Sequence, residues 1–379
     1  MYSKRVISTQ DPPLVKLGNI ASKTSNCISL GQGAPYYQPP KQILENIIHN
    51  IEDPLYHRYT PDPGLYELRK LVADKYQQEY GVYTDYNQIM ITPGANQAFI
   101  NCLISIVDEG DSIILISPYY FNHEMAANLL NIHTINIPLS KEFMLPLDQI
   151  AFHLPKVKAI VIVNPGNPSG NVISRQELQH LEELLIDTNV WLISDETYEY
   201  FTYNNIKHFS ASSLQRIKDQ VIIISSFSKT FGIPGWRVGY YHAPNDFITI
   251  STKVQDTTGI CAPAISQILV IELLRSHKYL ISDFVNIMKK NHELAVDLLA
   301  EIHWLEATPS NAAYYLFPHQ LTSMDTEKLA MKLITDYGVY IVPGIGFGRD
   351  WSNYLRISFA NVDEETIQEA FSRLKSLKY

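Results

Sequence analysis

The chain has 379 residues, of which 46% are hydrophobic and 18% charged, and its mean hydropathy is -0.09. These values predict an ordinary soluble protein of two lobes, with enough apolar material for a sizeable core. The formal net charge of -9 comes without a clustered basic patch, which argues against nucleic acid or an anionic membrane as a partner. No run approaches the roughly 18 apolar residues that span a bilayer, and no signal-like apolar region follows the N-terminal charges.

The cysteine content indicates the compartment. Three cysteines occur at wide spacing without a CxxC pair, namely Cys27, Cys102 and Cys261. An odd number of isolated cysteines is typical of free thiols under reducing conditions. We therefore expect a cytoplasmic protein without disulfides, and we expect no metal site.

The first two thirds of the chain alternate between helical and strand-like patterns. A helix is predicted over 65–80, ending at Gly81, which suits the position after a helix. Apolar, β-branched runs follow at 113–116, 159–163, 190–193 and 221–224, separated by amphipathic stretches such as 175–185. Strands that are apolar on both faces and alternate with helices indicate an α/β fold with a buried parallel sheet.

The last third predicts a smaller α+β lobe. A helical segment covers about 266–305 with a break near Ser276, and a closing helix has Asn361 as its expected N-cap. Between them lie three short predicted strands, at 313–317, 339–342 and 354–359. No repeat or flexible linker separates the lobes, so we expect the binding site in a cleft between them.

Polar residues follow three of the predicted strands at the edge where ligands bind to open parallel sheets. The segment Asn-Pro-Gly-Asn-Pro-Ser-Gly at 164–170 follows one strand and contains Asn167. Asp195 and Tyr198 follow the next strand. The third strand precedes Ser226, Lys229 and Arg237. These strand ends together present an amide, a carboxylate and an ammonium beside hydroxyls and a guanidinium.

A pyridoxal phosphate enzyme needs this set of groups. Lys229 fits the amine that forms a Schiff base with the cofactor aldehyde, provided that the site lowers its pKa. Asp195 fits the carboxylate that keeps the pyridine nitrogen protonated. Asn167 and Tyr198 fit the donors needed by the ring hydroxyl. Ser226, Arg237 and the backbone amides of Ala95 and Asn96 fit the phosphate.

Each residue on its own also has an ordinary structural explanation. The segment 164–170 is typical of a turn, Asp195 of a helix cap, Lys229 of a surface lysine and Arg237 of an ion pair. Their occurrence together after consecutive buried strands favours the cofactor site. The glycine cluster at 344–348 follows a proline and precedes no clear helix, so we predict a turn there rather than a dinucleotide loop.

Ten motifs in chain order resemble those of fold-type I pyridoxal phosphate enzymes of the class I/II aminotransferase family. They lie at 30–35, 59–64 with 68–69, 92–96, 117–120, 164–170, 195–198, 226–229, 235–239, 343–344 and 354–358. The resemblance covers nearly the whole chain. It implies a large domain, 46–275, with a mostly parallel seven-stranded sheet between helices. It also implies a smaller α+β domain formed by 1–45 and 276–379.

The resemblance also assigns residues to the cofactor. It implies that Lys229 forms the internal aldimine and then moves the α-carbon proton as acid and base. Asp195 would pair with the pyridinium, and Tyr198 would assist catalysis at the ring hydroxyl together with Asn167. Further cofactor-binding residues would be Tyr120, stacked on the ring, and Gly94, Ala95, Asn96, Ser226 and Arg237, around the phosphate.

Other implied roles concern the substrate and a second subunit. Arg356 would bind the α-carboxylate as a bidentate fork, with Asn167 beside it, and Gly33 would lie in an N-terminal segment that closes over the substrate. Tyr59 would reach the cofactor phosphate of a neighbouring subunit, which implies a homodimer with shared active sites.

The implied reaction is ping-pong transamination between an L-amino acid and a 2-oxo acid, in amino-acid metabolism and biosynthesis. The same fold also supports C–S β-elimination, γ-elimination and cyclisation, and a non-catalytic cofactor-binding regulator is a more distant alternative. A lysine found at the position of Asn96 in one aspartate-using branch is absent here. Aspartate or glutamate remains an alternative donor if the pocket adapts. The pocket candidates Tyr36, Tyr37, Tyr120 and Asn122 would also suit substrates with neutral or aromatic side chains.

Overall fold

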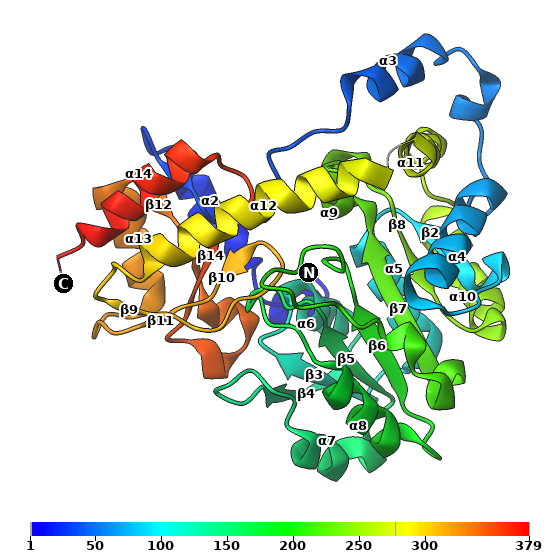
Figure 1. Ribbon diagram of the computed structural model, residues 1–379. Helices are drawn as coiled ribbons and strands as arrows, with labels where there is room; N and C mark the ends of the chain where they lie inside the picture. Colours follow the sequence, from blue (N-terminus) through cyan, green and yellow to red (C-terminus); the bar gives the residue numbers. More distant parts are fainter. Residues whose placement is uncertain (1, 277, 379) are drawn as a thin grey trace.

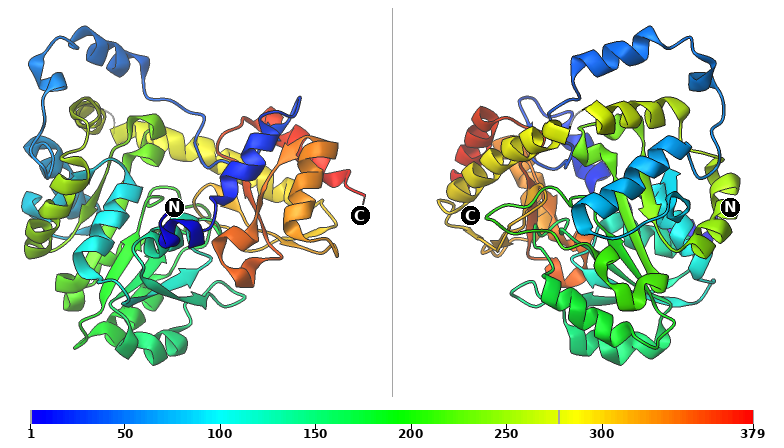
Figure 2. Two further views of the ribbon diagram at one scale, coloured as in Figure 1. Left: turned by 180° about the vertical axis from the view of Figure 1, so that it is seen from behind. Right: turned by 45° about the vertical axis from the view of Figure 1, so that its right-hand side comes forward.

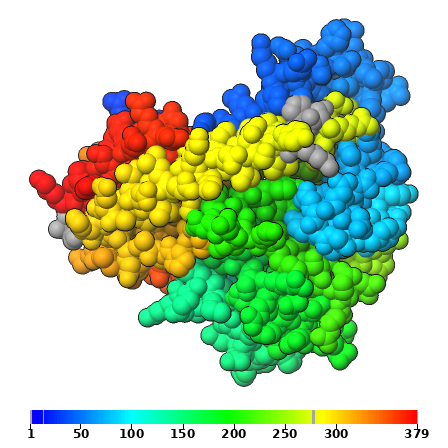
Figure 3. Space-filling view, in the orientation of Figure 1, coloured from blue at the N-terminus to red at the C-terminus, as the bar shows by residue number. Residues whose placement is uncertain are grey.

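A long helix, α12 (Lys278–Leu299), runs between the two lobes of the molecule (Figure 1). The computed structural model describes residues 2–276 and 278–378, so residues 1, 277 and 379 of the expected domains lie outside it. The larger lobe holds a central sheet between helices, and the smaller lobe contains the C-terminal third. In the space-filling view, α12 lies across the junction of the lobes (Figure 3).

The large lobe is built on seven strands in the order β2-β8-β7-β6-β5-β3-β4. Only β8 runs antiparallel to its neighbours, so the sheet is mostly parallel, as predicted. The strands are β2 (Ile89–Thr92), β3 (Ser112–Ser117), β4 (His133–Pro138), β5 (Ala159–Val163), β6 (Trp191–Asp195), β7 (Val221–Ser226) and β8 (Gly239–His242).

Helices cover both faces of this sheet because alternate strand residues face opposite sides and are apolar on each. On one face pack α5 (Ala95–Ile106), α6 (Phe121–Leu129) and α10 (Asn245–Gly259). On the other pack α4 (Tyr66–Tyr80), α8 (Arg175–Leu185) and α11 (Ala264–Ser276). The large lobe also contains α7 (Leu147–His153) and the four-residue α9 (Phe227–Thr230).

The predicted helix boundaries hold where a local signal fixes them. The helix α4 ends at Gly81, whose φ of 69° is left-handed, as the sequence predicts. The helix α8 begins with a capping box in which the Ser174 side chain accepts from the Glu177 backbone and Glu177 reciprocates. The predicted break near Ser276 falls beside residue 277, which lies outside the described residues; α11 covers the residues up to Ser276 and α12 those from Lys278.

The small lobe combines the C-terminal third with part of the N-terminal segment. The strand β1 (Ile28–Ser29) pairs in parallel with β12 (Val339–Tyr340), and α2 (Pro13–Ala21) packs on α13 (Thr326–Tyr337) (Figure 2). The other elements here are β9 (Leu305–Glu306), β10 (Tyr315–Leu316), β11 (His319–Gln320), β13 (Val342–Pro343), β14 (Leu355–Ser358) and α14 (Glu364–Lys375).

Two short N-terminal helices contact the large lobe. The helix α1 (Lys4–Ser8) lies against α6, and α3 (Lys41–His49) lies against α11. The N-terminal segment therefore touches both lobes in turn. We propose that the chain divides into a large domain, 46–275, and a small domain formed by 1–45 and 276–379.

Two predictions for the small lobe were wrong in detail. The closing helix is capped by Asp363, whose side chain accepts from Thr366 N at 3.0 Å, and not by Asn361. Asn361 instead donates to the Ser29 carbonyl at 2.9 Å, which ties the two segments together. The long helix ends at Leu299 rather than near 305, because Leu305 pairs with Gln320 in a strand.

The glycine cluster forms a short 3-10 helix over Gly344–Phe347, in keeping with the predicted turn. The three cysteines are free thiols, as expected. Within the described ranges, no helix has the length and apolar character needed to cross a membrane.

Candidate active site

The lobes enclose a cavity of about 270 Å³ at the carboxyl ends of β5, β6 and β7. Most of the expected site residues line it: Gly33, Ala95, Asn96, Tyr120, Asn167, Asp195, Tyr198, Ser226, Lys229, Arg237 and Arg356. Gly94 is the N-cap of α5, directly before the lining residues. Tyr59 does not line the cavity, and its side chain is 80% exposed.

Lys229 projects from α9, whose N-cap Ser226 accepts from Ser228 N at 3.2 Å. The Lys229 Nζ donates to the Gly33 carbonyl at 2.6 Å. Burial, followed by the charges of Arg356 and Arg237, lowers the pKa of Lys229 to about 8. A lysine with this pKa holds a useful fraction of neutral amine near neutral pH.

Asp195 ends β6 as a buried carboxylate with fixed hydrogen bonds. Its Oδ1 accepts from the Thr197 backbone N at 3.1 Å and from Thr197 Oγ1 at 2.7 Å. Its Oδ2 lies 3.3 Å from His123 Nε2. His123 comes from α6 and packs on Phe99 with ring centroids 4.1 Å apart. The carboxylate is therefore held in one orientation toward the cavity.

His123 was not among the site residues predicted from the sequence. Its spacing from Tyr120 could have indicated it, because residues three apart in a helix lie on the same face. The ring contact between the two is edge-to-face with centroids 5.5 Å apart.

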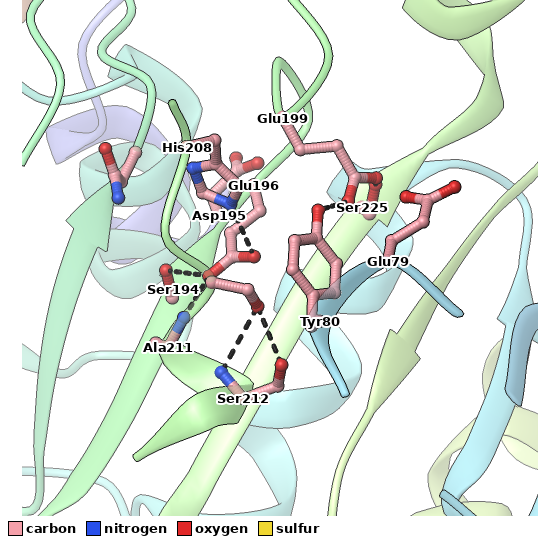
Figure 4. A network of polar contacts seen from close by, with 12 residues as sticks. Glu79, Tyr80, Ser194, Asp195, Glu196, Glu199, His208, Ala211, Ser212 and Ser225 are labelled. Carbon is pink, nitrogen blue, oxygen red and sulfur yellow. Dashed lines mark hydrogen bonds and ion pairs between the residues drawn. The ribbon is translucent and has the colours of Figure 1, made fainter. Parts of the chain in front are cut away.

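Two buried glutamates, Glu196 and Glu199, anchor the segment after β6 (Figure 4). Glu196 accepts from Ser194 Oγ and the Ala211 N–H, at 2.9 and 2.8 Å. Glu199 accepts from Lys75 at 2.5 Å and from Tyr80 at 2.6 Å. Burial alone would raise the pKa of Glu199, but Lys75 and the hydrogen bonds hold it below its usual value. These anchors fix the backbone that carries Asp195.

The N-terminus of α5 and Arg237 form a second group of donors. Gly94 has a φ of 90°, and a Cβ there would lie only 2.6 Å from Arg237 Nη2. The first helical amides, on Ala95 and Asn96, face no intrahelical acceptor. Arg237 adopts a left-handed φ of 51° and donates to the Pro234 carbonyl at 2.9 Å. Helix amides, a guanidinium and the Ser226 hydroxyl make this end suited to a phosphate.

Tyrosines line the wall between these groups. The Tyr198 and Tyr315 hydroxyls lie 2.7 Å apart. A side chain on Gly33 would overlap the Tyr315 hydroxyl, so the chain needs glycine at this approach. The sequence predicted Tyr315 only as a strand residue. Its contact with Gly33 could not be predicted from local pattern, because the two residues are far apart in sequence.

Arg356 is a buried cation without an anionic partner. Its side chain is 1% exposed, and no carboxylate forms an ion pair with it within residues 2–276 and 278–378. Nη1 donates to Asn167 Oδ1 at 3.0 Å and Nη2 to the Gly31 carbonyl at 2.6 Å. Its Nε has no partner among the described groups. Since buried charges are normally paired, the arrangement indicates an anionic ligand.

The pocket candidates differ in position. Tyr120 lines the cavity, and its hydroxyl accepts from Asn122 Nδ2 at 3.0 Å. Tyr36, Tyr37 and Asn122 are not among the lining residues; Tyr36 is 42% exposed and the Tyr37 hydroxyl contacts the backbone of Lys229.

The groups around the cavity fit pyridoxal phosphate. They offer an amine with a lowered pKa, a buried carboxylate and a helix N-terminus beside a guanidinium, which are the three features that the aldehyde, ring nitrogen and phosphate require. Arg356 adds a buried cation that has no carboxylate partner among the described residues. The fold and the site together define a class, pyridoxal phosphate enzymes built on an α/β sheet.

Comparison with known proteins identifies the family. The family model "Aminotransferase class I and II" matches residues 25–374. An aromatic aminotransferase of Arabidopsis thaliana, ISS1, is 34% identical, over 99% of this chain and 95% of that protein. An aspartate aminotransferase of Pyrococcus abyssi is 30% identical, over 96% of this chain and 94% of that protein. The solved structure of an aromatic aminotransferase from Pyrococcus horikoshii OT3 matches with a TM-score of 0.88 and 29% identity, over 95% of this chain and 97% of that chain.

The chain therefore belongs to the class I and II aminotransferase family. Together with the fold, these similarities make it a pyridoxal phosphate-dependent aminotransferase that acts on an amino acid and a 2-oxo acid.

The lowered pKa of Lys229 predicts a titration near neutrality. In the cofactor-free protein, an amine-reactive label should modify Lys229 with a midpoint near pH 8 rather than 10.5, because burial and two guanidinium groups disfavour the ammonium. In Arg356→Met the midpoint should rise, since one repelling cation is gone. Mass spectrometry of labelled peptides across pH would measure both. A midpoint near 10.5 in the wild type would contradict the electrostatic account.

Proposed function

We propose that the chain transfers the amino group of an L-amino acid with a neutral or aromatic side chain to a 2-oxo acid. The observation that carries the proposal is the buried Arg356 without a carboxylate partner, beside the lysine of lowered pKa. An α-carboxylate would supply the missing charge, and its two oxygens match the donor fork of a guanidinium.

We further propose the roles of the cofactor-holding residues. Asp195, supported by His123, would face the ring nitrogen, and Asn167 and Tyr198 the ring hydroxyl. Tyr120 would lie against the ring. The phosphate would be held at the start of α5 by Gly94, Ala95 and Asn96, at the end of β7 by Ser226, and by Arg237, which lies just before β8.

When bound, pyridoxal phosphate supplies an electron sink for the pair left at the α-carbon. The chain supplies the rest. Arg356 fixes the carboxylate and thereby the orientation of the α-carbon. Lys229, with a pKa of about 8, is roughly one tenth neutral at pH 7 and can accept and return the α-carbon proton. The N-terminal segment, through Gly33, would cover the site and exclude water.

The lining supports a neutral substrate side chain. Its cations are Lys229, Arg237 and Arg356, each of which already has a proposed task. The other lining residues contributed by the N-terminal segment and β5 are uncharged: Leu14, Gln32, Ala34 and Val163. Two relatives are named aromatic aminotransferases and others aspartate aminotransferases, so the names alone leave both donors open.

We also propose a homodimer in the cytoplasm. The 80% exposed Tyr59 follows the exposed stretch after α3, where a second subunit would cover it. The three free thiols suit a reducing compartment.

The donor is tested by half-reactions with single amino acids. In the purified holoenzyme, phenylalanine or tyrosine should bleach the near-visible cofactor band with at least tenfold higher efficiency than aspartate, and a 2-oxo acid should restore the band. The reason is that the lining offers no spare cation for a second carboxylate. Preference for aspartate would overturn the substrate proposal, and release of ammonia with pyruvate would establish a lyase instead.

The carboxylate site is tested by Arg356→Lys. This change should lower kcat/KM for the amino acid about 100-fold, or about 2.8 kcal/mol, because an ammonium cannot replace the bidentate fork. The cofactor band should persist. Arg373→Lys, on the distant helix α14, is the matched control and should stay within twofold of the wild type. An unchanged kcat/KM in Arg356→Lys would refute the assigned role.

A further inference from the structure

Two buried tyrosine hydroxyls meet at the backbone carbonyl of Lys229. The Tyr37 hydroxyl donates to this oxygen, and the Tyr314 hydroxyl lies 3.1 Å from it and 2.5 Å from the Tyr37 hydroxyl. The Tyr37 and Tyr314 side chains are 6% and 0% exposed. Tyr37 belongs to the N-terminal segment, Tyr314 to the small lobe and Lys229 to the large lobe. We call this junction of three chain segments the tyrosine clasp.

The backbone carbonyl of Lys229 lacks a helical N–H donor, because α9 ends one residue later. The helix α9 stops at Thr230, so the carbonyl lies among those that a helix end leaves without intrahelical partners. In a continuing helix the donor would be Ile233 N, four residues on. That N–H donates instead to the Ser228 carbonyl at 3.1 Å. A carbonyl held away from water without a donor destabilises the fold.

The number of available hydrogens determines which oxygen donates to which in the tyrosine clasp. Three oxygens lie in mutual contact, but only the two hydroxyls carry hydrogens. The favoured arrangement is a chain in which Tyr314 donates to Tyr37 and Tyr37 donates to the Lys229 carbonyl, since the Tyr37 contact is the shorter of the two to that oxygen. Burial raises the pKa of both phenols well above the usual value, so both remain donors.

The segment that carries Tyr37 also contacts the other end of Lys229. Gly33, four residues earlier, accepts from the Lys229 Nζ at 2.6 Å. The Tyr37 ring stacks on Phe284 of α12, with centroids 3.9 Å apart and planes at 12°. Its backbone presses on Gly232, where φ is 66° and an added Cβ would overlap the Tyr37 carbonyl. The N-terminal segment thus holds the lysine at both its backbone and its amine.

We propose that Tyr37 and Tyr314 are positioning residues that fix the main chain of Lys229, so that its amine works from one defined place beneath the N-terminal segment. The inference rests on the proposed function in that Lys229 is the reacting amine. Ordinary packing does not account for the pair, because phenylalanine would fill nearly the same space and only the hydroxyls reach the carbonyl. A displaced amine loses rate steeply, since proton transfer depends on alignment.

The test compares Tyr37→Phe, Tyr314→Phe and the double variant with Tyr241→Phe. Tyr241 is a matched control, because its buried hydroxyl donates to Ser251 at 2.7 Å in the large-lobe core, away from Lys229. Two readouts use the cofactor-free protein, namely amide hydrogen exchange over 227–233 and the labelling midpoint of Lys229. The third is the split of kcat and KM in the holoenzyme.

The double variant should show exchange at least tenfold faster over 227–233. The Lys229 midpoint should rise from about 8 toward 10.5, since a loosened amine regains water. In the holoenzyme, kcat should fall at least tenfold while KM stays within twofold. Each single variant should show a smaller effect, because the remaining hydroxyl can still donate to the carbonyl.

The proposal is overturned if the double variant matches Tyr241→Phe in exchange, midpoint and kcat. If the double variant does not fold, hydrogen exchange in the single variant Tyr37→Phe tests the proposal. Faster exchange confined to 227–233 then supports the clasp, and exchange spread over the whole chain contradicts it. A wild type that transaminates no amino acid would refute the proposed function, while the two cofactor-free readouts would still decide on the clasp.

Discussion

The burial of two cations in one cavity is the constraint on which the site depends. Arg356 is nearly inaccessible, and its charge lies close enough to Lys229 to lower the lysine pKa. Burial of Lys229 itself is the larger cause of this shift, and the two guanidinium groups add to it. The same buried environment therefore leaves one cation without an anionic partner and lowers the pKa of the other. The cost of the unpaired guanidinium is offset only in part, by Asn167, the Gly31 carbonyl and two aromatic faces.

The rest of the fold holds these charges in place. The sheet brings Asp195 and Lys229 to one edge because β6 and β7 are parallel neighbours. The glutamate anchors fix the segment after β6, and the small lobe supplies Arg356 through β14. The N-terminal segment contributes Leu14, Gln32, Gly33 and Ala34 to the lining. The cavity is therefore formed only where the large lobe, the small lobe and this segment meet.

The sequence predicted what depends on local pattern. Buried strands show as apolar runs, so the residues after them, including Asp195 and Lys229, could be assigned to one sheet edge. Asn361 and Asp363 are both good capping residues, and sequence alone could not choose between them, because Asn361 is occupied by Ser29 from the opposite end of the chain. The contacts of Tyr37 and Tyr315 likewise join segments that are distant in sequence, for which one chain carries no readable signal.

The central claim is that Lys229 is the residue to which the cofactor attaches. Its most direct test is to reduce the holoenzyme with borohydride, digest it and locate the trapped pyridoxyl group by mass spectrometry. The account predicts a single modified peptide that contains Lys229, with no modification in Lys229→Ala. A pyridoxyl group trapped on another lysine, or none on the wild type, would contradict it.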